Sequence, residues 1–236
     1  MDMILIALAC ALIGYLFGAF PTGYFIGRLW NIDVRKHGSG RTGGTNVLRT
    51  AGWGAFALTV IGDVLKGVLP VLLSRLLFPA ALDAHTLAVL GALVGHNRSV
   101  FIAMLAKPDL RITYAPPPIG WLQRVAQHGR GGAGVATSAA AMLALFPPIV
   151  LVMIVPIILI LVIVRYASVA SLTTGIVSPF VMLFFVFHGD APWSYFILNA
   201  IVGIIIVIVH RPNIERLRAG NERRFGYQLG RKKHEV

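Results

Sequence analysis

Three short polar segments of this sequence carry side chains that could do chemistry, although each lies beside a long apolar run. They are residues 37–49 (HGSGRTGGTNVLR), 129–137 (GRGGAGVAT) and 210–222 (HRPNIERLRAGNE). Guanidinium groups and free backbone N–H groups bind phosphate oxygens, and an imidazole can take up a proton near neutral pH. The residue types therefore point to binding of a phosphorylated compound together with proton transfer.

In the first segment, Arg49 follows Thr45 by one helical turn, so both side chains would face the same anion. The cost of burying a cation in an apolar protein favours a phosphate site that includes Arg49 and Ser39. We place Gly38, Thr45 and Asn46 in the same site. The alternative is structural, since Ser, Thr and Asn also cap helices and occupy turns.

The second segment places Gly131, Gly132 and Gly134 immediately before an apolar run. Free N–H groups and the dipole at a helix N-terminus favour an anion, so we expect a phosphate cradle that also includes Arg130 and Thr137. A tight turn or close helix packing would use the same glycines. The spacing differs from the Walker pattern, which argues against nucleotide hydrolysis.

The third segment begins with His210 and Asn213, whose spacing of three puts both side chains on one helical face. His210 is a candidate general base, and the alternative is an interfacial histidine that marks the end of a span. Pro212 suits the first turn of a new helix, which would leave His210 at a break. Glu215 and Glu222 are expected to pair with nearby arginines. The catalytic candidates are therefore His210, Asn213 and Ser39.

The elements that must position these segments are membrane-spanning helices. With 57% hydrophobic and 13% charged residues, the chain has the composition of an all-α polytopic membrane protein rather than of a soluble domain. Its apolar runs predict about seven transmembrane helices: Met3–Ile26 with a kink or an end near Phe20 and Pro21, Trp53–Phe78, His85–Leu105, Ala133–Phe146, Ile149–Val164, Tyr166–Phe187 and Trp193–Val209.

The basic residues predict the orientation. The formal net charge is +12. Lys and Arg follow the first, third, fifth and seventh runs, and the connections after the second, fourth and sixth runs contain neither residue. The positive-inside rule then puts the N-terminus outside, the C-terminus in the cytoplasm, and all three polar segments on the cytoplasmic side. No basic patch carries the interleaved aromatic residues of a nucleic-acid site. Cys10 is the only cysteine and the histidines are isolated, so no metal site is expected.

Four of the polar residues inside or at the start of the apolar runs are further candidates. Asp63 and Lys66 share a helical face, and ionisable groups within a span are usually functional, so we include Lys66 among the phosphate contacts. Ser168 and Ser171 lie at the cytoplasmic start of the sixth run. Substrate contact there competes with helix capping and packing.

A longer series of residues, in chain order, matches the pattern of one known family: Pro21-Thr22-Gly23-Tyr24, Arg35 to Gly40, Gly43, Thr45-Asn46, Arg49, Asp63, Lys66-Gly67, Gly95-His96-Asn97, Gly131-Gly132, Gly134 to Thr137, Arg165-Tyr166, His210-Arg211 and Asn213-Ile214. These blocks resemble the bacterial membrane acyl-phosphate:glycerol-3-phosphate acyltransferases. By position, Ser39 and Arg49 belong to the first motif of that family, Gly131, Gly132 and Gly134 to the second, and His210, Asn213 and Glu222 to the third.

The resemblance implies transfer of a fatty acyl group from acyl phosphate to the 1-hydroxyl of glycerol 3-phosphate, without a cofactor. It implies a multi-pass protein of the bacterial inner membrane whose site faces the cytoplasm. The substrates and the lipid bilayer are the expected partners. The oligomeric state stays open, and a monomer is compatible with the sequence.

The sequence also departs from the family pattern. Arg41 and Gly44 stand where the first motif has Asn and Ala, and the two lysines of the second motif are replaced by Arg130 and Ala133. An inserted segment at about 103–128 is expected to form an interfacial flap within a single domain, 1–236, that ends in a basic tail at 211–236. Two other hypotheses are a transporter of a phosphorylated solute and a catalytically silent homologue.

Overall fold

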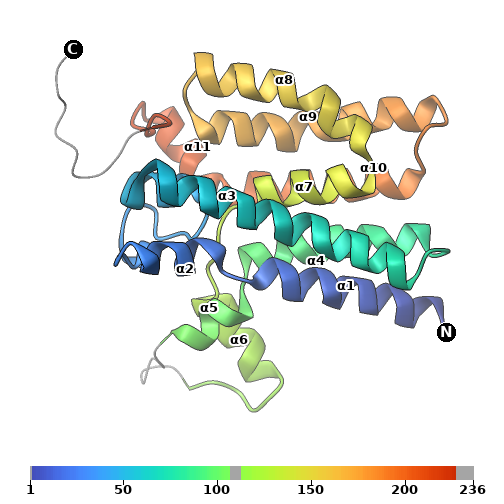
Figure 1. Ribbon diagram of the computed structural model, residues 1–236, viewed down its shortest axis with the longest axis horizontal. Helices are drawn as coiled ribbons and strands as arrows, with labels where there is room; N and C mark the ends of the chain where they lie inside the picture. The colour runs from blue at the N-terminus through green and yellow to red at the C-terminus, as the bar shows by residue number, and fades with distance from the viewer. Residues whose placement is uncertain (1, 107–112, 227–236) are drawn as a thin grey trace.

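The structure is a computed structural model that describes residues 2–106 and 113–226 (Figure 1). The expected insertion at 103–128 and the expected basic tail at 211–236 are therefore described only in part, since 107–112 and 227–236 lie outside these ranges. Eleven α-helices and two short 3-10 helices account for the regular structure of the described part: α1 Met3–Ala19, α2 Thr22–Leu29, η1 Val34–Lys36, α3 Gly44–Leu77, η2 Leu82–Ala84, α4 His85–Asn97, α5 Val100–Leu105, α6 Ile119–His128, α7 Val135–Leu145, α8 Pro147–Ile163, α9 Ala167–Phe187, α10 Trp193–Val209 and α11 Arg211–Arg218.

The first apolar run breaks where the sequence predicts. Helix α1 ends at Ala19, Phe20 and Pro21 are not helical, and α2 begins at Thr22. Before the break, α1 packs closely on α4 because glycines face alanines across the contact. A Cβ atom at Gly14 or Gly18 would overlap the backbone of Ala88 or Ala92. Small residues hold these two helices together, as in other membrane helix pairs.

Helix α3 extends the second run toward the N-terminus, since it begins at Gly44 rather than at Trp53. Its first turns contain the polar residues of the first segment, which apolar periodicity cannot assign to a span. Gly52 lies inside the helix with φ 86° and marks a kink between the polar start and the apolar remainder. The second half of the first segment is therefore helical, and this fixes the directions of Thr45, Asn46 and Arg49.

Fewer helices are clearly long enough to span a membrane than the seven expected. By length and composition, three segments of the described chain qualify, Met3–Leu29, Gly44–Leu77 and Ala167–Phe187. A bent pair of helices, Trp193–Val209 and Arg211–Arg218, raises the number of possible spans to four if the pair is counted as one. The two helices of this pair are bent by 56° at His210. The break after α10 agrees with the prediction from Pro212. The third run is divided because Ser99 accepts from the N–H group of Ile102 and starts α5.

The helices form two groups joined by α7. Helices α1, α3 and α4 lie on one side, α8, α9 and α10 lie on the other, and α7 contacts α3, α4 and α8 (Figure 1). The loop before α3, the C-terminal end of α10 and α11 lie at the end of the bundle opposite the N-terminus (Figure 1). The fold thus brings the first and third polar segments to the same end.

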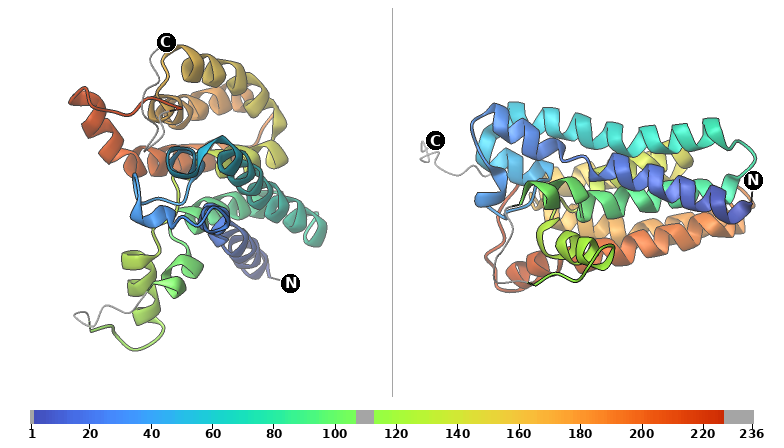
Figure 2. Two further views of the ribbon diagram at one scale, coloured as in Figure 1. Left: turned by 60° about the vertical axis from the view of Figure 1, so that its left-hand side comes forward. Right: turned by 90° about the horizontal axis from the view of Figure 1, so that it is seen from below.

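Helices α5 and α6 lie beside this bundle, and α6 lies within residues 103–128, which the sequence analysis expects to be an insertion (Figure 2). Helix α6 exposes Ile119, Trp121 and Leu122, while the Arg124 guanidinium donates to the carbonyl groups of Ala103 and Ala106. An exposed apolar side on a short helix that also carries polar residues is typical of helices that lie in a membrane interface.

Candidate functional site

A single cavity of about 630 Å³ brings the three polar segments together. Twelve of the residues predicted from sequence line it: Gly38, Ser39, Thr45, Asn46, Arg49, Arg130, Gly134, Ser168, Ser171, His210, Asn213 and Glu222. Four others, Lys66, Gly131, Gly132 and Thr137, lie outside its lining. We call this space the site cavity.

The first segment is shaped by the amide of Asn46, which is buried at the start of α3. Its nitrogen donates to the carbonyl groups of Val34, His37 and Arg41, and its oxygen accepts from the N–H group of Ser39 at 2.8 Å. Both ends of this amide are therefore engaged with the loop backbone. Asn46 holds the loop, and the Ser39 hydroxyl remains the group of this pair that can contact a ligand.

Arg49 is the clearest sign of an anion site. The residue is 6% exposed, and within the described residues its Nε atom has no hydrogen-bond partner. A buried guanidinium is unfavourable unless its donors are engaged, and its fork matches phosphate or carboxylate oxygens. The arrangement therefore suits an anion in the site cavity.

Arg41 adds a second cation to the lining. Its Nη2 donates to the carbonyl of Val209 at 2.8 Å, which ties the first segment to the end of α10. Burial, together with the nearby cations of Arg130, Arg98 and Arg216, lowers the pKa of Arg41 to about 10. The side chain stays protonated at neutral pH, so it contributes positive charge to the same cavity that Ala133 lines.

The glycines of the first and second segments touch each other. A Cβ atom at Gly132 would overlap Nε2 of His96 and would lie 2.9 Å from the Cα atom of Gly43. Gly134 has φ 84°, a conformation that glycine tolerates best, and it precedes α7 without a side-chain cap. The loop therefore leads into a helix N-terminus, as predicted. Gly134, Val135 and Ala136 line the site cavity there, where first-turn N–H groups favour an anion.

Gly132→Ala is expected to lower the midpoint of thermal unfolding measurably, since a methyl group inserted into a tight contact costs about 1–3 kcal/mol. The variant Gly54→Ala is the matched control, because a Cβ atom there meets only Trp30 at an ordinary distance of 3.7 Å. Thermal unfolding of both variants in the same detergent tests the contact. Equal midpoints for the two variants would show that the loops are not packed as described.

His210 lies at the break between α10 and α11 and is 5% exposed. Its Nδ1 atom is 2.8 Å from the carbonyl oxygen of Ile206, and because a carbonyl only accepts, Nδ1 carries the proton. In the neutral ring Nε2 then has a free lone pair. Burial lowers the pKa of His210 below its ordinary value of 6.5, so the ring is neutral and basic at neutral pH.

Glu222 organises the third segment. Its carboxylate accepts from Asn213 at 3.0 Å, from Ser168 at 3.3 Å and from Arg216 Nε at 2.7 Å. These bonds join α9, α11 and the chain that follows α11. Because a carboxylate only accepts, it turns the Asn213 amide so that the nitrogen faces Glu222, which leaves the amide oxygen as an acceptor. The expected pairing of Glu215 and Glu222 with arginines is also present, as Arg211–Glu215 and Arg216–Glu222.

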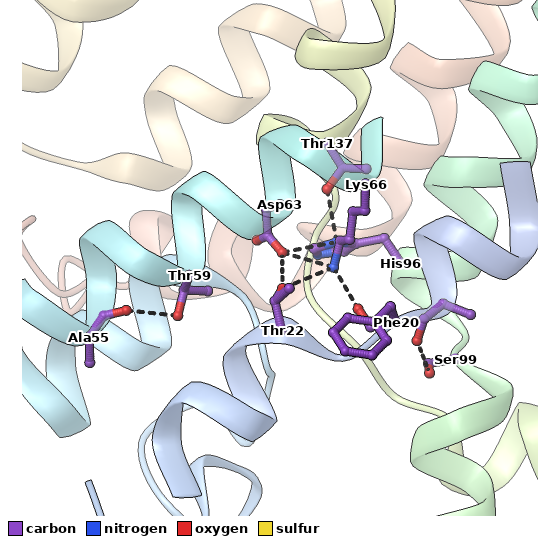
Figure 3. A network of polar contacts seen from close by, with 10 residues as sticks. Phe20, Thr22, Ala55, Thr59, Asp63, Lys66, His96, Ser99 and Thr137 are labelled. Carbon is purple, nitrogen blue, oxygen red and sulfur yellow. Dashed lines mark hydrogen bonds and ion pairs between the residues drawn. The ribbon is translucent and has the colours of Figure 1, made fainter. Parts of the chain in front are cut away.

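A buried polar network, whose contacts Figure 3 shows, reaches the lining of the site cavity through Asp63 and His96. Lys66 Nζ contacts the Asp63 carboxylate at 2.8 Å and donates to the carbonyl of Phe20 at 3.1 Å. Thr22 donates to Asp63 at 2.6 Å, and His96 Nδ1 is 3.0 Å from the Thr137 hydroxyl. The structure thus engages Lys66 and Thr137 in cross-links between helices, while Asp63 and His96 line the cavity.

Away from the three polar segments, the lining of the site cavity is mostly apolar, although Ser178 and Asn199 also belong to it. The apolar side chains include those of α7, α8 and α10, among them Met142, Ile149, Met153, Ile157, Val202 and Ile206. A compound that fills the whole cavity therefore combines a charged group with a hydrocarbon portion.

Several lining residues were not predicted as site residues: His96, Asn199, Arg216 and Arg223. Arg216 follows Asn213 by three residues, so helical spacing alone could have included it. Asn199 lies in the middle of an apolar run and Arg223 follows the end of α11. Only the packing of α9, α10 and the terminal segment places them at the cavity.

Comparison with known proteins agrees with this architecture. Residues 8–106 and 117–220 match the family described as glycerol-3-phosphate acyltransferase. The chain is 38% identical to a glycerol-3-phosphate acyltransferase of Rubrobacter xylanophilus, over 93% of this chain and 95% of that protein. It is 36% identical to glycerol-3-phosphate acyltransferase 2 of Moorella thermoacetica, over 93% and 97% respectively.

Two solved structures have the same fold. Both are of PlsY (YgiH), an integral membrane glycerol 3-phosphate acyltransferase, in its glycerol 3-phosphate and lysophosphatidic acid forms. The first has a TM-score of 0.73 and 31% identity, with 93% of this chain and 95% of that chain covered. The second has a TM-score of 0.71 and 30% identity, with 92% and 94% covered. The chain belongs to the glycerol-3-phosphate acyltransferase family and is a multi-pass membrane protein.

Proposed function

We propose that this protein transfers a fatty acyl group from acyl phosphate to the sn-1 hydroxyl of glycerol 3-phosphate, giving lysophosphatidic acid and inorganic phosphate. The observation that carries the proposal is the buried, incompletely bonded guanidinium of Arg49 in a cavity whose lining away from the polar segments is mostly apolar. A phosphate and an acyl chain together match both parts of this lining. No cofactor is required, since a mixed anhydride already contains a good leaving group.

In the proposed mechanism the substrate phosphates are held by Arg49, the Ser39 hydroxyl, and Arg130 with the Gly134 turn. The acceptor hydroxyl oxygen attacks the carbonyl carbon of the acyl phosphate, and the bond from that carbon to the phosphate oxygen breaks. The proton of the hydroxyl passes to Nε2 of His210 and leaves with the departing phosphate or with water. Positioning and charge stabilisation supply most of the rate increase.

The remaining residues support this arrangement. Asn213, turned by Glu222, is proposed to accept from a substrate hydroxyl, and Ser168 and Ser171 complete the wall on α9. Gly38, Thr45 and Asn46 shape the first loop, and Gly131 and Gly132 allow the second loop to approach it. Thr137 and Lys66 are proposed to act through the buried polar network of Asp63 and His96.

The proposal includes the membrane arrangement predicted from the basic residues. The chain is a single domain of about seven spans in the bacterial inner membrane, with the N-terminus outside and the site facing the cytoplasm. The end of the bundle that holds the site is also rich in arginine, which supports this orientation.

The direct test is an assay of the purified protein with palmitoyl phosphate and labelled glycerol 3-phosphate, with palmitoyl-CoA as the alternative donor. We expect lysophosphatidic acid from the acyl phosphate only. Product formed only from palmitoyl-CoA would show that acyl phosphate is not the donor. Uptake of unchanged glycerol 3-phosphate into proteoliposomes, without product, would instead identify a transporter.

The pH dependence of kcat follows from the low pKa of His210. Because the ring must be neutral to accept a proton, and burial lowers its pKa below 6.5, kcat should remain above half of its maximum at pH 6.5. The decline should be centred at a more acidic pH, where Nε2 becomes protonated. Rates at saturating substrate test this. A decline of kcat centred above pH 6.5 would show that a group other than His210 controls it.

A further inference from the structure

A second cavity of about 650 Å³ adjoins the site cavity and has no part in the proposed reaction. Its walls come from the end of α4, the last turn of α6, the last turns of α10 and the start of α11. The two cavities share Arg41, Arg130 and Pro212. The second cavity is therefore a separate space on the far side of a common arginine wall.

The lining of this second cavity is strongly basic. Arg41, Arg98, Arg130 and Arg211 contribute to it, and none of its described lining residues is acidic. Glu215 pairs with Arg211 at 3.1 Å, but this pair is exposed and Glu215 does not line the cavity. Burial lowers the pKa of Arg41 most, and the nearby cations of Arg130 and Arg98 lower it further, because like charges in one lining repel one another. An anion bound among them would relieve that repulsion.

The same cavity has an apolar wall that a soluble anion would not need. Val94 of α4 and Ile205, Ile208 and Val209 of α10 form this wall. Val94 is 38% exposed and Ile208 is 66% exposed, so the wall continues into the outer surface of two apolar helices. In a membrane protein that outer surface faces lipid chains.

The position of the second cavity matches the level of lipid headgroups. It lies where α4 and α10 end, and Ala126 and Gln127 of α6 line one side of it. Helix α6 also exposes Trp121 and Leu122, and tryptophan is enriched at the membrane interface. A phosphate at the arginines would thus lie at the interface, with its acyl chains beside α4 and α10.

We propose that the second cavity binds one anionic phospholipid of the surrounding bilayer. Arg98 and Arg211 hold the phosphate, and an acyl chain lies along Val94, Ile205 and Ile208. A zwitterionic lipid is disfavoured, because its quaternary ammonium group would lie among the same arginines. The proposal does not depend on the identity of the acyl donor, since Arg98 and Arg211 do not line the site cavity.

The experiment is native mass spectrometry of the full-length protein in detergent with phosphatidylglycerol, phosphatidylcholine of the same chains, or inorganic phosphate as the probe. We expect one molecule of phosphatidylglycerol to bind about tenfold or more tightly than phosphatidylcholine, because a charge-assisted contact contributes at least the free energy of a tenfold affinity change. Inorganic phosphate that competes with phosphatidylglycerol at equal concentration would overturn the assignment to a lipid.

A charge-matched pair of variants tests the location. Arg98→Gln combined with Arg211→Gln should abolish the preference for phosphatidylglycerol. Arg28→Gln combined with Arg218→Gln removes two exposed arginines that line neither cavity, and it should retain the preference. Equal losses in both double variants would show only a general effect of net charge and would overturn the proposal. If the first double variant fails to fold, Arg98→Gln alone provides the same comparison with Arg28→Gln.

Discussion

Arg49→Ala is expected to reduce acyl transfer by about 100-fold or more, the loss typical when a charged or oriented donor to the reacting group is removed. Arg49 is buried within the site cavity, and its Nε atom lacks a partner among the described residues. Its free donors are therefore available for a substrate phosphate. Steady-state rates with acyl phosphate and glycerol 3-phosphate measure the effect, and Arg28→Ala, an exposed arginine away from the cavity, is the control.

A stability measurement separates binding from folding for the same variant. Glycerol 3-phosphate should raise the unfolding midpoint of the native protein, since a ligand at 100 times its Kd stabilises by about 2.7 kcal/mol. Arg49→Ala should lose that increase while its midpoint without ligand changes little, because no hydrogen bond of Nε is removed. If the variant keeps the ligand-dependent increase, Arg49 does not bind the phosphate of glycerol 3-phosphate.

His210→Ala is expected to lower kcat by about 100-fold or more with a smaller change in KM, which is the usual contribution of a positioned general base. Nδ1 of His210 is engaged by the Ile206 carbonyl at 2.8 Å, so the basic Nε2 is the atom available to the acceptor hydroxyl. Separate measurement of kcat and KM for both substrates tests this role. A kcat within about twofold of the native value would show that the substrate's own phosphate takes the proton.

His188→Ala is the matched control for His210→Ala. Its Nδ1 atom is 2.9 Å from the Phe184 carbonyl at the end of α9, which repeats the bond that His210 makes at the end of α10. His188 is exposed and does not line the site cavity. Both variants therefore lose the same kind of helix-end contact, and only His210→Ala should lose turnover.

The sequence by itself determined the class of protein and most of the candidate site. Composition predicted a helical membrane protein. The prolines at positions 21 and 212 predicted helix breaks that the structure contains. These features are local, because proline restricts its own backbone and apolar runs must avoid water. Glycine, arginine and histidine beside apolar runs also indicated an anion site, since those residue types have few structural reasons to occur together.

Only the tertiary structure decided which of these residues meet and what each is free to do. Asn46 was predicted as a ligand contact, but its amide is hydrogen-bonded to three carbonyl groups and one N–H group of the loop. Lys66 pairs with Asp63 and joins helices instead of lining the cavity, while Arg49 is left with a free donor. Hydrogen-bond partners come from segments far apart in the chain, so spacing within one segment cannot show whether a polar group is already satisfied.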